Sequence, residues 1–197
     1  MHPIASEALS PSRVSQFINC QLAFRYKYVD KLPQKPSAAA VRGNLVHGVL
    51  ERTLALPAAE RSLAQAESQV DSVYDELLAE QPARVVAVDS DIAWPEFGDS
   101  QPSAAAVSAF KAEANRLLAK YFELEDPKSV EVVAIERYVR AELPAGPTVH
   151  GYIDRLDQRP SGELVITDYK TGKAPAPQYR DKAWSQLMTY ALLLRQA

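Results

Sequence analysis

Residues 150–173 read HGYIDRLDQRPSGELVITDYKTGK, and this stretch has the pattern of a β-hairpin. Two runs of alternating apolar and polar residues flank the triplet Pro160-Ser161-Gly162. Proline presets φ for a type I turn, and glycine tolerates the left-handed conformation that closes a three-residue loop. The sequence therefore predicts a hairpin in which Arg159 faces Glu163.

The length of that loop decides which side chains lie together. With three loop residues, the numbers of paired residues add up to 322, so Asp154 lies opposite Asp168. Lys170 shares their face, because side chains alternate along a strand. A loop of four residues would instead place Asp154 opposite Thr167 and separate the carboxylates. We therefore predict two carboxylates and a lysine on one face.

Two opposed carboxylates repel each other, so the pair requires something that offsets the repulsion. Mg²⁺ or Mn²⁺ would do so, since both prefer oxygen ligands and leave room for water and a phosphate oxygen. Lys170 would then orient or deprotonate a water and offset charge on the phosphate. The alternative reading is a surface ion pair between Asp168 and Lys170.

Length and composition indicate one domain over residues 1–197. The chain has 197 residues, of which 47% are hydrophobic, enough for a real core. A net charge of −3 excludes an overall basic nucleic-acid binder, so a polyanion would have to meet a local groove. The single cysteine, Cys20, excludes an internal disulfide framework and cannot alone hold zinc or an iron–sulfur cluster. We expect Cys20 to be a small buried hydrophobe in a reducing compartment.

The sequence shows no membrane-targeting feature. It has no run of 18 apolar residues, and MHPIASEALSPS lacks the basic start and apolar core of a signal peptide. We therefore expect a soluble, cytoplasmic protein without a membrane partner.

The remaining pattern predicts an α/β, or α+β, architecture. Ser10 is the expected N-cap of an amphipathic helix, and further helices are predicted at residues 38–56, 63–80, 104–123 and 180–197. A strand from Val130 and the two hairpin arms form an antiparallel meander. The expected result is a helical N-terminal half and a sheet flanked by helices.

A basic, tyrosine-rich segment, Arg25-Tyr26-Lys27-Tyr28, follows the first helix. Its tyrosines either offer a stacking surface for single strands or pack on the core.

Several motifs occur in a characteristic order along the chain. They are SRVSQFINCQLAFRYKY at 12–28, Arg42-Gly43 followed by His47, GYID at 151–154, DYKTGK at 168–173, and QLMTY at 186–190. In this order they resemble the RecB-type nuclease domain of the PD-(D/E)xK superfamily, the RecB family exonucleases. The resemblance covers nearly the whole chain and implies a restriction-endonuclease-like core with a central mixed sheet.

The resemblance also implies roles for particular residues. Lys170 is the expected catalytic lysine. The expected metal ligands are His47, Asp154, Asp168 and the backbone carbonyl of Tyr169. Arg42, Gln186 and Tyr190 are expected on the substrate side, where Gln186 and Tyr190 approach the DNA backbone or position the lysine. Glu136 is expected behind the ligands.

The implied activity is that of a divalent-metal-dependent deoxyribonuclease, an exonuclease in DNA repair or recombination. It would use Mg²⁺ or Mn²⁺ on single-stranded DNA or free ends, with a helicase or other protein partner. Some members carry a four-cysteine iron–sulfur cluster, but Cys20 is the only cysteine here, so we expect none. Members also continue past the last helix, which makes this chain either a C-terminal truncation or a minimal version.

Other readings of the same residues remain open. His47 could pair with Glu51 one helical turn away, and Gln186 and Tyr190 could flank a packing helix. The chain could be a non-catalytic DNA-binding or assembly module that keeps the fold. It could also be another metal-dependent enzyme, such as a phosphatase or sugar hydrolase.

Overall fold

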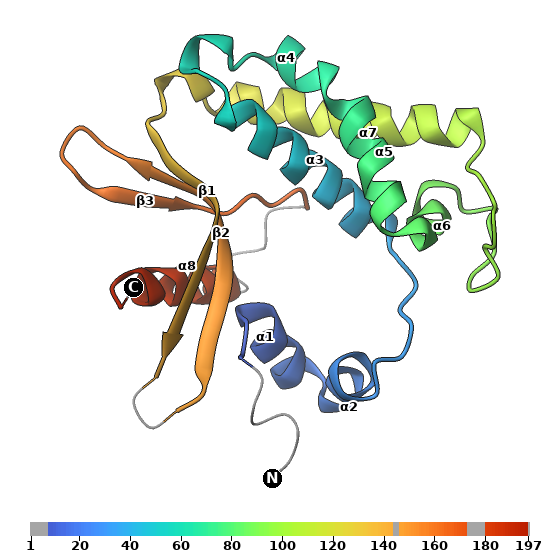
Figure 1. The fold of residues 1–197 in the computed structure, drawn as a ribbon, viewed down its shortest axis with the longest axis horizontal. Helices are drawn as coiled ribbons and strands as arrows, with labels where there is room; N and C mark the ends of the chain where they lie inside the picture. The colour runs from blue at the N-terminus through green and yellow to red at the C-terminus, as the bar shows by residue number, and fades with distance from the viewer. Residues whose placement is uncertain (1–7, 144–145, 173–179, 197) are drawn as a thin grey trace. The chain divides into compact units, whose positions relative to one another are not determined.

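A computed structural model describes residues 8–143, 146–172 and 180–196, without the side chains of 180–183 (Figure 1). It combines helices with a three-stranded sheet of order β1-β2-β3, which confirms the α/β fold class. The described residues form two compact units. The sheet unit contains the chain up to Gln34, Val133–Asp168 and the last helix, and the helical unit contains Lys35–Val132 and the segment from Tyr169. Among the described helices, none combines the length and the apolar character needed to cross a membrane.

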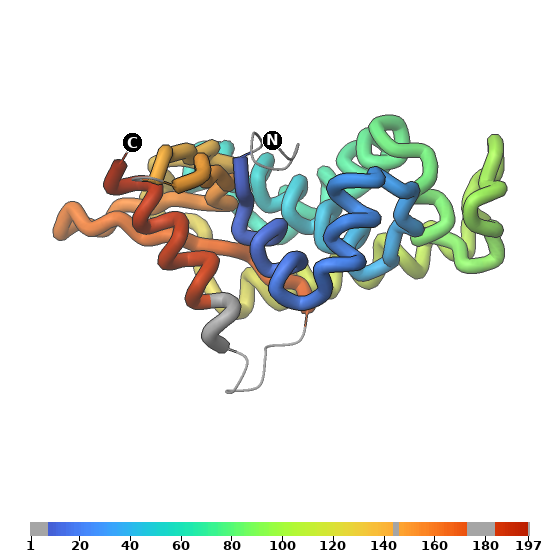
Figure 2. The backbone as a smooth tube through the Cα atoms, turned by 90° about the horizontal axis from the view of Figure 1, so that it is seen from below, coloured from blue at the N-terminus to red at the C-terminus, as the bar shows by residue number. Residues whose placement is uncertain are grey.

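The sheet unit is built on a meander. Its strands are β1 (Val132–Glu142), β2 (Thr148–Gln158) and β3 (Leu164–Thr167), and its helices are α1 (Pro11–Asn19), α2 (Gln21–Phe24), a π-helix (Arg25–Val29) and α8 (Arg180–Leu194). β1 and β2 run in opposite directions, β2 and β3 pair antiparallel, and Leu9 adds a parallel bridge to Val149 (Figure 1). α8 lies along this sheet, in contact with β2 and β3 (Figure 2).

The hairpin register is confirmed. Arg155 pairs with Thr167, so paired residue numbers add up to 322 as predicted. Beyond the ladder, the Arg159 amide donates to the Glu163 carbonyl at 2.8 Å, and Gly162 has a φ of +87°. The three-residue loop is therefore present, and the four-residue alternative is excluded.

The helix at the end of the chain is predicted from the apolar spacing of Trp184, Leu187, Met188, Ala191 and Leu194, but α8 packs on the sheet mainly through other residues. Tyr190 and Leu193 are buried against Ile153 and its neighbours, whereas Trp184 and Met188 are exposed. Periodicity identified the helix, but it does not tell which apolar stripe is covered when the helix has two.

The N-terminal helices begin as predicted and bury less than expected. Ser10 is the N-cap of α1, and its side chain accepts the amide of Arg13. Yet Ile18 is 77% exposed, while Phe24 is buried. The prediction of a buried Cys20 is wrong: its side chain is exposed, and Sγ accepts the Ala23 amide as the N-cap of α2.

The helical unit is centred on α3 (Ala38–Ala55), which is the predicted helix 38–56. Its other helices are α4 (Leu63–Ser68), α5 (Val70–Glu80), α6 (Val85–Val88) and α7 (Ala104–Leu124), with 3-10 turns at Ala58–Glu60, Pro82–Arg84 and Pro127–Ser129. α3 contacts α4, α5, α6 and α7 (Figure 1). Leu45, Val49 and Leu50 of α3 are fully buried in this packing.

The helix predicted at residues 63–80 is broken at Gln69, which separates α4 from α5. The backbone amide of Gln69 donates to the Ala66 carbonyl, three residues earlier. The side-chain amide of Gln69 donates to the Gln65 carbonyl, four residues earlier. The side chain thus replaces the backbone bond that would continue the α-helix. The spacing of apolar residues does not indicate this break in the helix.

The hairpin loop provides a test of the fold. Gly162→Val places a β-branched residue at a φ of +87°, and we expect it to lower the free energy of unfolding by about 1–2 kcal/mol. Gly162→Asn is the matched control, since asparagine tolerates the left-handed region. Urea denaturation measures both variants, and equal stability of the two would contradict the assigned turn.

Candidate active site

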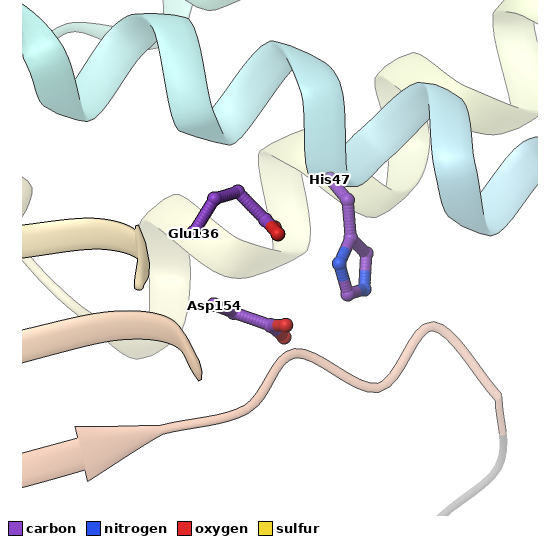
Figure 3. A group of neighbouring side chains, drawn as sticks. All are labelled: His47, Glu136 and Asp154. Atoms are coloured by element: carbon purple, nitrogen blue, oxygen red, sulfur yellow. The ribbon is translucent and has the colours of Figure 1, made fainter. Parts of the chain in front are cut away.

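Two carboxylates face each other on neighbouring strands of the sheet unit. Glu136 lies on β1 and Asp154 on β2, and each offers a carboxylate oxygen within 4.8 Å of the other's. Both side chains are half-buried. Figure 3 shows the side chains of Glu136 and Asp154. Carboxylate oxygens are the ligands that hard divalent cations prefer, so the pair is chemically able to hold a metal ion. A bound cation would also offset the repulsion between the two carboxylates.

The backbone of Glu136 is unusual. Its φ is +46°, although it is a non-glycine residue inside a strand. Such a conformation costs of order 1–3 kcal/mol and persists only where the surroundings impose it, often at functional sites. Glu136 is therefore a candidate metal ligand, whereas the sequence predicted that it would only support the ligands.

Asp168 follows directly after β3 and continues the hairpin register toward Asp154. The side-chain nitrogen of Gln186 on α8 donates to Asp168 Oδ1 and to the Tyr190 hydroxyl oxygen, each at 2.9 Å. One primary amide has two protons, so both are used here. Gln186 therefore fixes the position of the Asp168 carboxylate relative to Tyr190.

Acidic side chains near Tyr190 affect the pKa of its hydroxyl. Its burial raises the pKa first, and the negative charges of Asp168, Asp154 and Glu136 raise it further, against a smaller opposing effect of the Gln186 hydrogen bond. A tyrosine hydroxyl is protonated at neutral pH, and the raised pKa extends that state to higher pH. Tyr190 is thus a neutral hydroxyl near acidic side chains, and its oxygen accepts from Gln186.

Gly151 makes room for the Tyr190 ring. A Cβ atom on Gly151 would lie 2.5 Å from Tyr190 Cε1, closer than van der Waals contact allows. The glycine of the Gly151-Tyr152-Ile153-Asp154 motif is therefore explained by packing rather than by turn geometry.

In the helical unit, His47 of α3 contacts the segment that follows Asp168. Its Nε2 lies 3.0 Å from the backbone oxygen of Tyr169, and the two rings meet edge to face. A carbonyl oxygen only accepts, so in this contact Nε2 carries the proton and Nδ1 keeps its lone pair. The imidazole of His47 is thus in contact with Tyr169.

A glycine also allows this approach. Gly43 lies one turn before His47, and a Cβ there would be 3.2 Å from Thr171 Oγ1. The segment can therefore lie close to α3. Tyr169, which His47 contacts, is the residue that follows Asp168 in the chain.

Two predicted residues are placed without their roles being tested. Lys170 is exposed in the irregular segment after β3. Arg42 on α3 is half-buried, with Nη1 4.0 Å from a carboxylate oxygen of Glu113. Catalysis by Lys170 and substrate binding by Arg42, Gln186 and Tyr190 stay predictions.

Sequence reasoning missed a buried ion pair directly beside the acidic residues. Arg155 is only 2% exposed; its Nε donates to the Asp157 carboxylate at 2.9 Å and its Nη2 to Thr167 Oγ1 at 3.3 Å. Arg155 follows Asp154 in the chain, and Thr167 precedes Asp168. The available signal was an arginine between two aspartates, Asp154 and Asp157, in one predicted strand.

Comparison with known proteins identifies related sequences over nearly the whole chain. The sequence profile of the PD-(D/E)XK nuclease superfamily matches residues 8–197. An ATP-dependent helicase/deoxyribonuclease subunit of Streptococcus pneumoniae serotype 19F (strain G54) is 25% identical over 203 residues, which is 95% of this chain and 17% of that protein. The exonuclease/helicase subunit RexB of S. pneumoniae serotype 4 matches with the same identity and coverage.

A phage protein matches over more of its own length. The gene 69 protein of Mycobacterium phage D29 is 25% identical over 190 residues, or 93% of this chain and 67% of the phage protein. By contrast, the chain spans only about a sixth of the helicase-associated proteins.

Substitution of Gly151 tests the packing around the acidic residues. We expect Gly151→Ala to lower the free energy of unfolding by about 1–3 kcal/mol, because the new Cβ overlaps the Tyr190 ring. Gly172→Ala is the control, since a Cβ there meets nothing within 4 Å.

The clash predicts coupling between the two positions. In a Tyr190→Leu background, Gly151→Ala should cost less than in the wild type, as measured by thermal unfolding in a double-mutant cycle. Additive effects would show that the two residues do not press on each other.

Proposed function

Because the chain belongs to the PD-(D/E)XK nuclease superfamily, we propose that it is a divalent-metal-dependent DNA nuclease that hydrolyses phosphodiester bonds. The observations that carry the proposal are the carboxylates of Glu136 and Asp154, which have oxygens within 4.8 Å of each other, and the carboxylate of Asp168, which Gln186 holds beside the Tyr190 hydroxyl. Close carboxylates are unfavourable alone and suited to a hard cation.

The residues fit such a cation. Asp154, Asp168 and Glu136 would supply carboxylate oxygens, which Mg²⁺ and Mn²⁺ prefer. His47 and the Tyr169 carbonyl would complete the set, as the resemblance implies. His47 Nε2 and the Tyr169 oxygen lie 3.0 Å apart, so both atoms are available at one place. The imidazole proton would then reside on Nδ1.

When bound, the metal ion supplies a coordinated water of lowered pKa and offsets charge on the phosphate. The protein side chains do the rest. Lys170 would orient the attacking water and offset developing negative charge. Gln186 would hold Asp168 in its orientation, and Arg42 would contact the DNA backbone.

The broader role rests on the names of related proteins. Helicase/deoxyribonuclease and exonuclease/helicase proteins support an exonuclease that acts with a helicase or other protein partner on single-stranded DNA or free ends. We place this activity in DNA repair or recombination in the cytoplasm.

Two substitutions test the chemistry. Asp168→Asn and Lys170→Met should each reduce Mg²⁺-dependent cleavage of labelled DNA by about 100-fold or more, because one removes a ligand charge and the other the group that orients the water. Glu163→Gln is the matched control: Glu163 is exposed at the turn of the same hairpin, and its loss should leave cleavage unchanged.

Full activity of either variant would refute the assignment. DNA binding without cleavage by the wild-type protein in Mg²⁺ and in Mn²⁺ would support the non-catalytic module instead.

Metal binding is testable apart from cleavage. A cation that binds the folded state raises its stability, by about 2.7 kcal/mol at 100 times Kd, so Mn²⁺ should raise the melting temperature of the wild type. Glu136→Gln and Asp154→Asn should diminish this shift, since each removes a ligand charge. Lys170→Met should keep the shift, because lysine is not a ligand. An undiminished shift in both acidic variants would place the metal elsewhere.

A further inference from the structure

Two aromatic side chains of the helical unit contact the ring of Tyr169. His47 on α3 and Tyr121 on α7 each lie with their ring centroid 5.7 Å from that of Tyr169, at interplanar angles of 89° and 85°. Edge-to-face pairs of this kind are favourable, because the positive edge of one ring meets the negative face of the other. Tyr169 belongs to the same compact unit as both partners, and its side chain is half-buried. The ring of Tyr169 is therefore fixed from two helices.

Tyr121 is itself held in place at the end of α7. Its hydroxyl donates to Glu125 Oε2 at 2.8 Å, and the Glu125 amide donates to the Tyr121 carbonyl at 3.1 Å as the C-cap of the helix. The ring of Phe122 meets that of Tyr121 edge to face at 5.3 Å. About one turn earlier, Leu118 is fully buried where α7 packs in the helical unit. Tyr121 thus presents its ring from a well-packed helix.

The backbone on both sides of Lys170 lies close to α3. On one side, the Tyr169 oxygen is 3.0 Å from His47 Nε2. On the other side, a Cβ on Gly43 would be 3.2 Å from Thr171 Oγ1. Lys170 follows Tyr169 directly, so the backbone conformation at Tyr169 sets the direction in which the lysine side chain leaves the chain. A contact that fixes the Tyr169 side chain therefore also helps to fix the Tyr169 carbonyl and the start of the lysine.

We infer that Tyr121 is a positioning residue, whose ring packs on Tyr169 and thereby fixes the Tyr169 carbonyl and the orientation of Lys170. The inference rests on the proposed nuclease function, in which Lys170 orients the attacking water. Tyr121 acts through Tyr169 and needs no contact with DNA. Orientation matters here because a displacement of about 1 Å at a catalytic group can lower a rate by about 100-fold.

Removal of the ring tests this role in cleavage. Tyr121→Leu should lower kcat for Mg²⁺-dependent cleavage of labelled DNA by about tenfold, because Lys170 loses part of its support. KM should stay close to that of the wild type, since the contacts with DNA are unchanged. Tyr121→Phe keeps the ring and should keep kcat within about twofold. An equal loss in Tyr121→Phe would contradict support by the ring.

Phe110→Leu separates positioning from a general loss of packing. This variant also removes a ring from α7, where Phe110 is buried with its ring centroid 6.3 Å from that of Tyr74. We expect it to lower the melting temperature at least as much as Tyr121→Leu does, because a buried ring is lost. Its kcat should equal that of the wild type, measured at a temperature where thermal melts show every variant to be folded.

A second readout needs neither metal nor DNA. The chain has three histidines, so ¹⁵N NMR resolves few imidazoles, and His47→Asn assigns the signal of His47. In EDTA at about pH 8, the wild-type imidazole should carry its proton on Nε2, which donates to the Tyr169 oxygen. Tyr121→Leu should shift these ring signals and lower the share of that tautomer, since Tyr169 is less firmly held. Tyr121→Phe and Phe110→Leu should leave them unchanged.

The two readouts separate this inference from the proposed function. An unchanged kcat in Tyr121→Leu, or an equal fall in Phe110→Leu, would overturn the positioning role and leave the nuclease proposal standing. Unchanged imidazole signals in Tyr121→Leu would overturn it as well. If the wild type cleaves no DNA in Mg²⁺ or Mn²⁺, the nuclease proposal fails and the imidazole signals alone decide. A change confined to Tyr121→Leu would then retain Tyr121 as the support of Tyr169.

Discussion

Repulsion between the close carboxylates of Glu136 and Asp154, with Asp168 following in the hairpin register, is the constraint on which the sheet unit depends. All three act on the buried hydroxyl of Tyr190, whose pKa they raise together with burial. Like charges this close destabilise a fold unless fixed donors or cations hold them. Gln186 is such a donor to Asp168. A divalent cation would offset the remaining repulsion between the carboxylates.

The elements around the carboxylates serve that constraint. The three-residue loop fixes the register that aligns Asp154 with Asp168, and Gln186 donates to Asp168 from α8. Arg155, which follows Asp154 in the chain, forms a buried ion pair with Asp157 and donates across the hairpin to Thr167. The left-handed backbone conformation of Glu136 is unfavourable for a non-glycine residue, and it persists where the surrounding structure holds the residue in place.

The sequence predicted what local rules determine. A proline and a glycine at the loop set the register, and the serine N-cap at Ser10 marked the start of α1. Features that depend on tertiary contacts were not predictable: the exposed Cys20, the break at Gln69, the stripe of α8 that packs, and the buried Arg155. The hairpin register indicated Asp154, Asp168 and Lys170, and the resemblance named the other site residues. Their roles in chemistry remain predictions, and the closeness of Glu136 to Asp154 required coordinates.

The most direct measurement of the central claim is anomalous scattering from crystals of the protein soaked in Mn²⁺. The account predicts a single strong peak within coordination distance of the Asp154 and Asp168 carboxylates, with Glu136 and the His47 imidazole also in contact. A structure that binds Mn²⁺ elsewhere, or that leaves these side chains apart at saturating Mn²⁺, would contradict it.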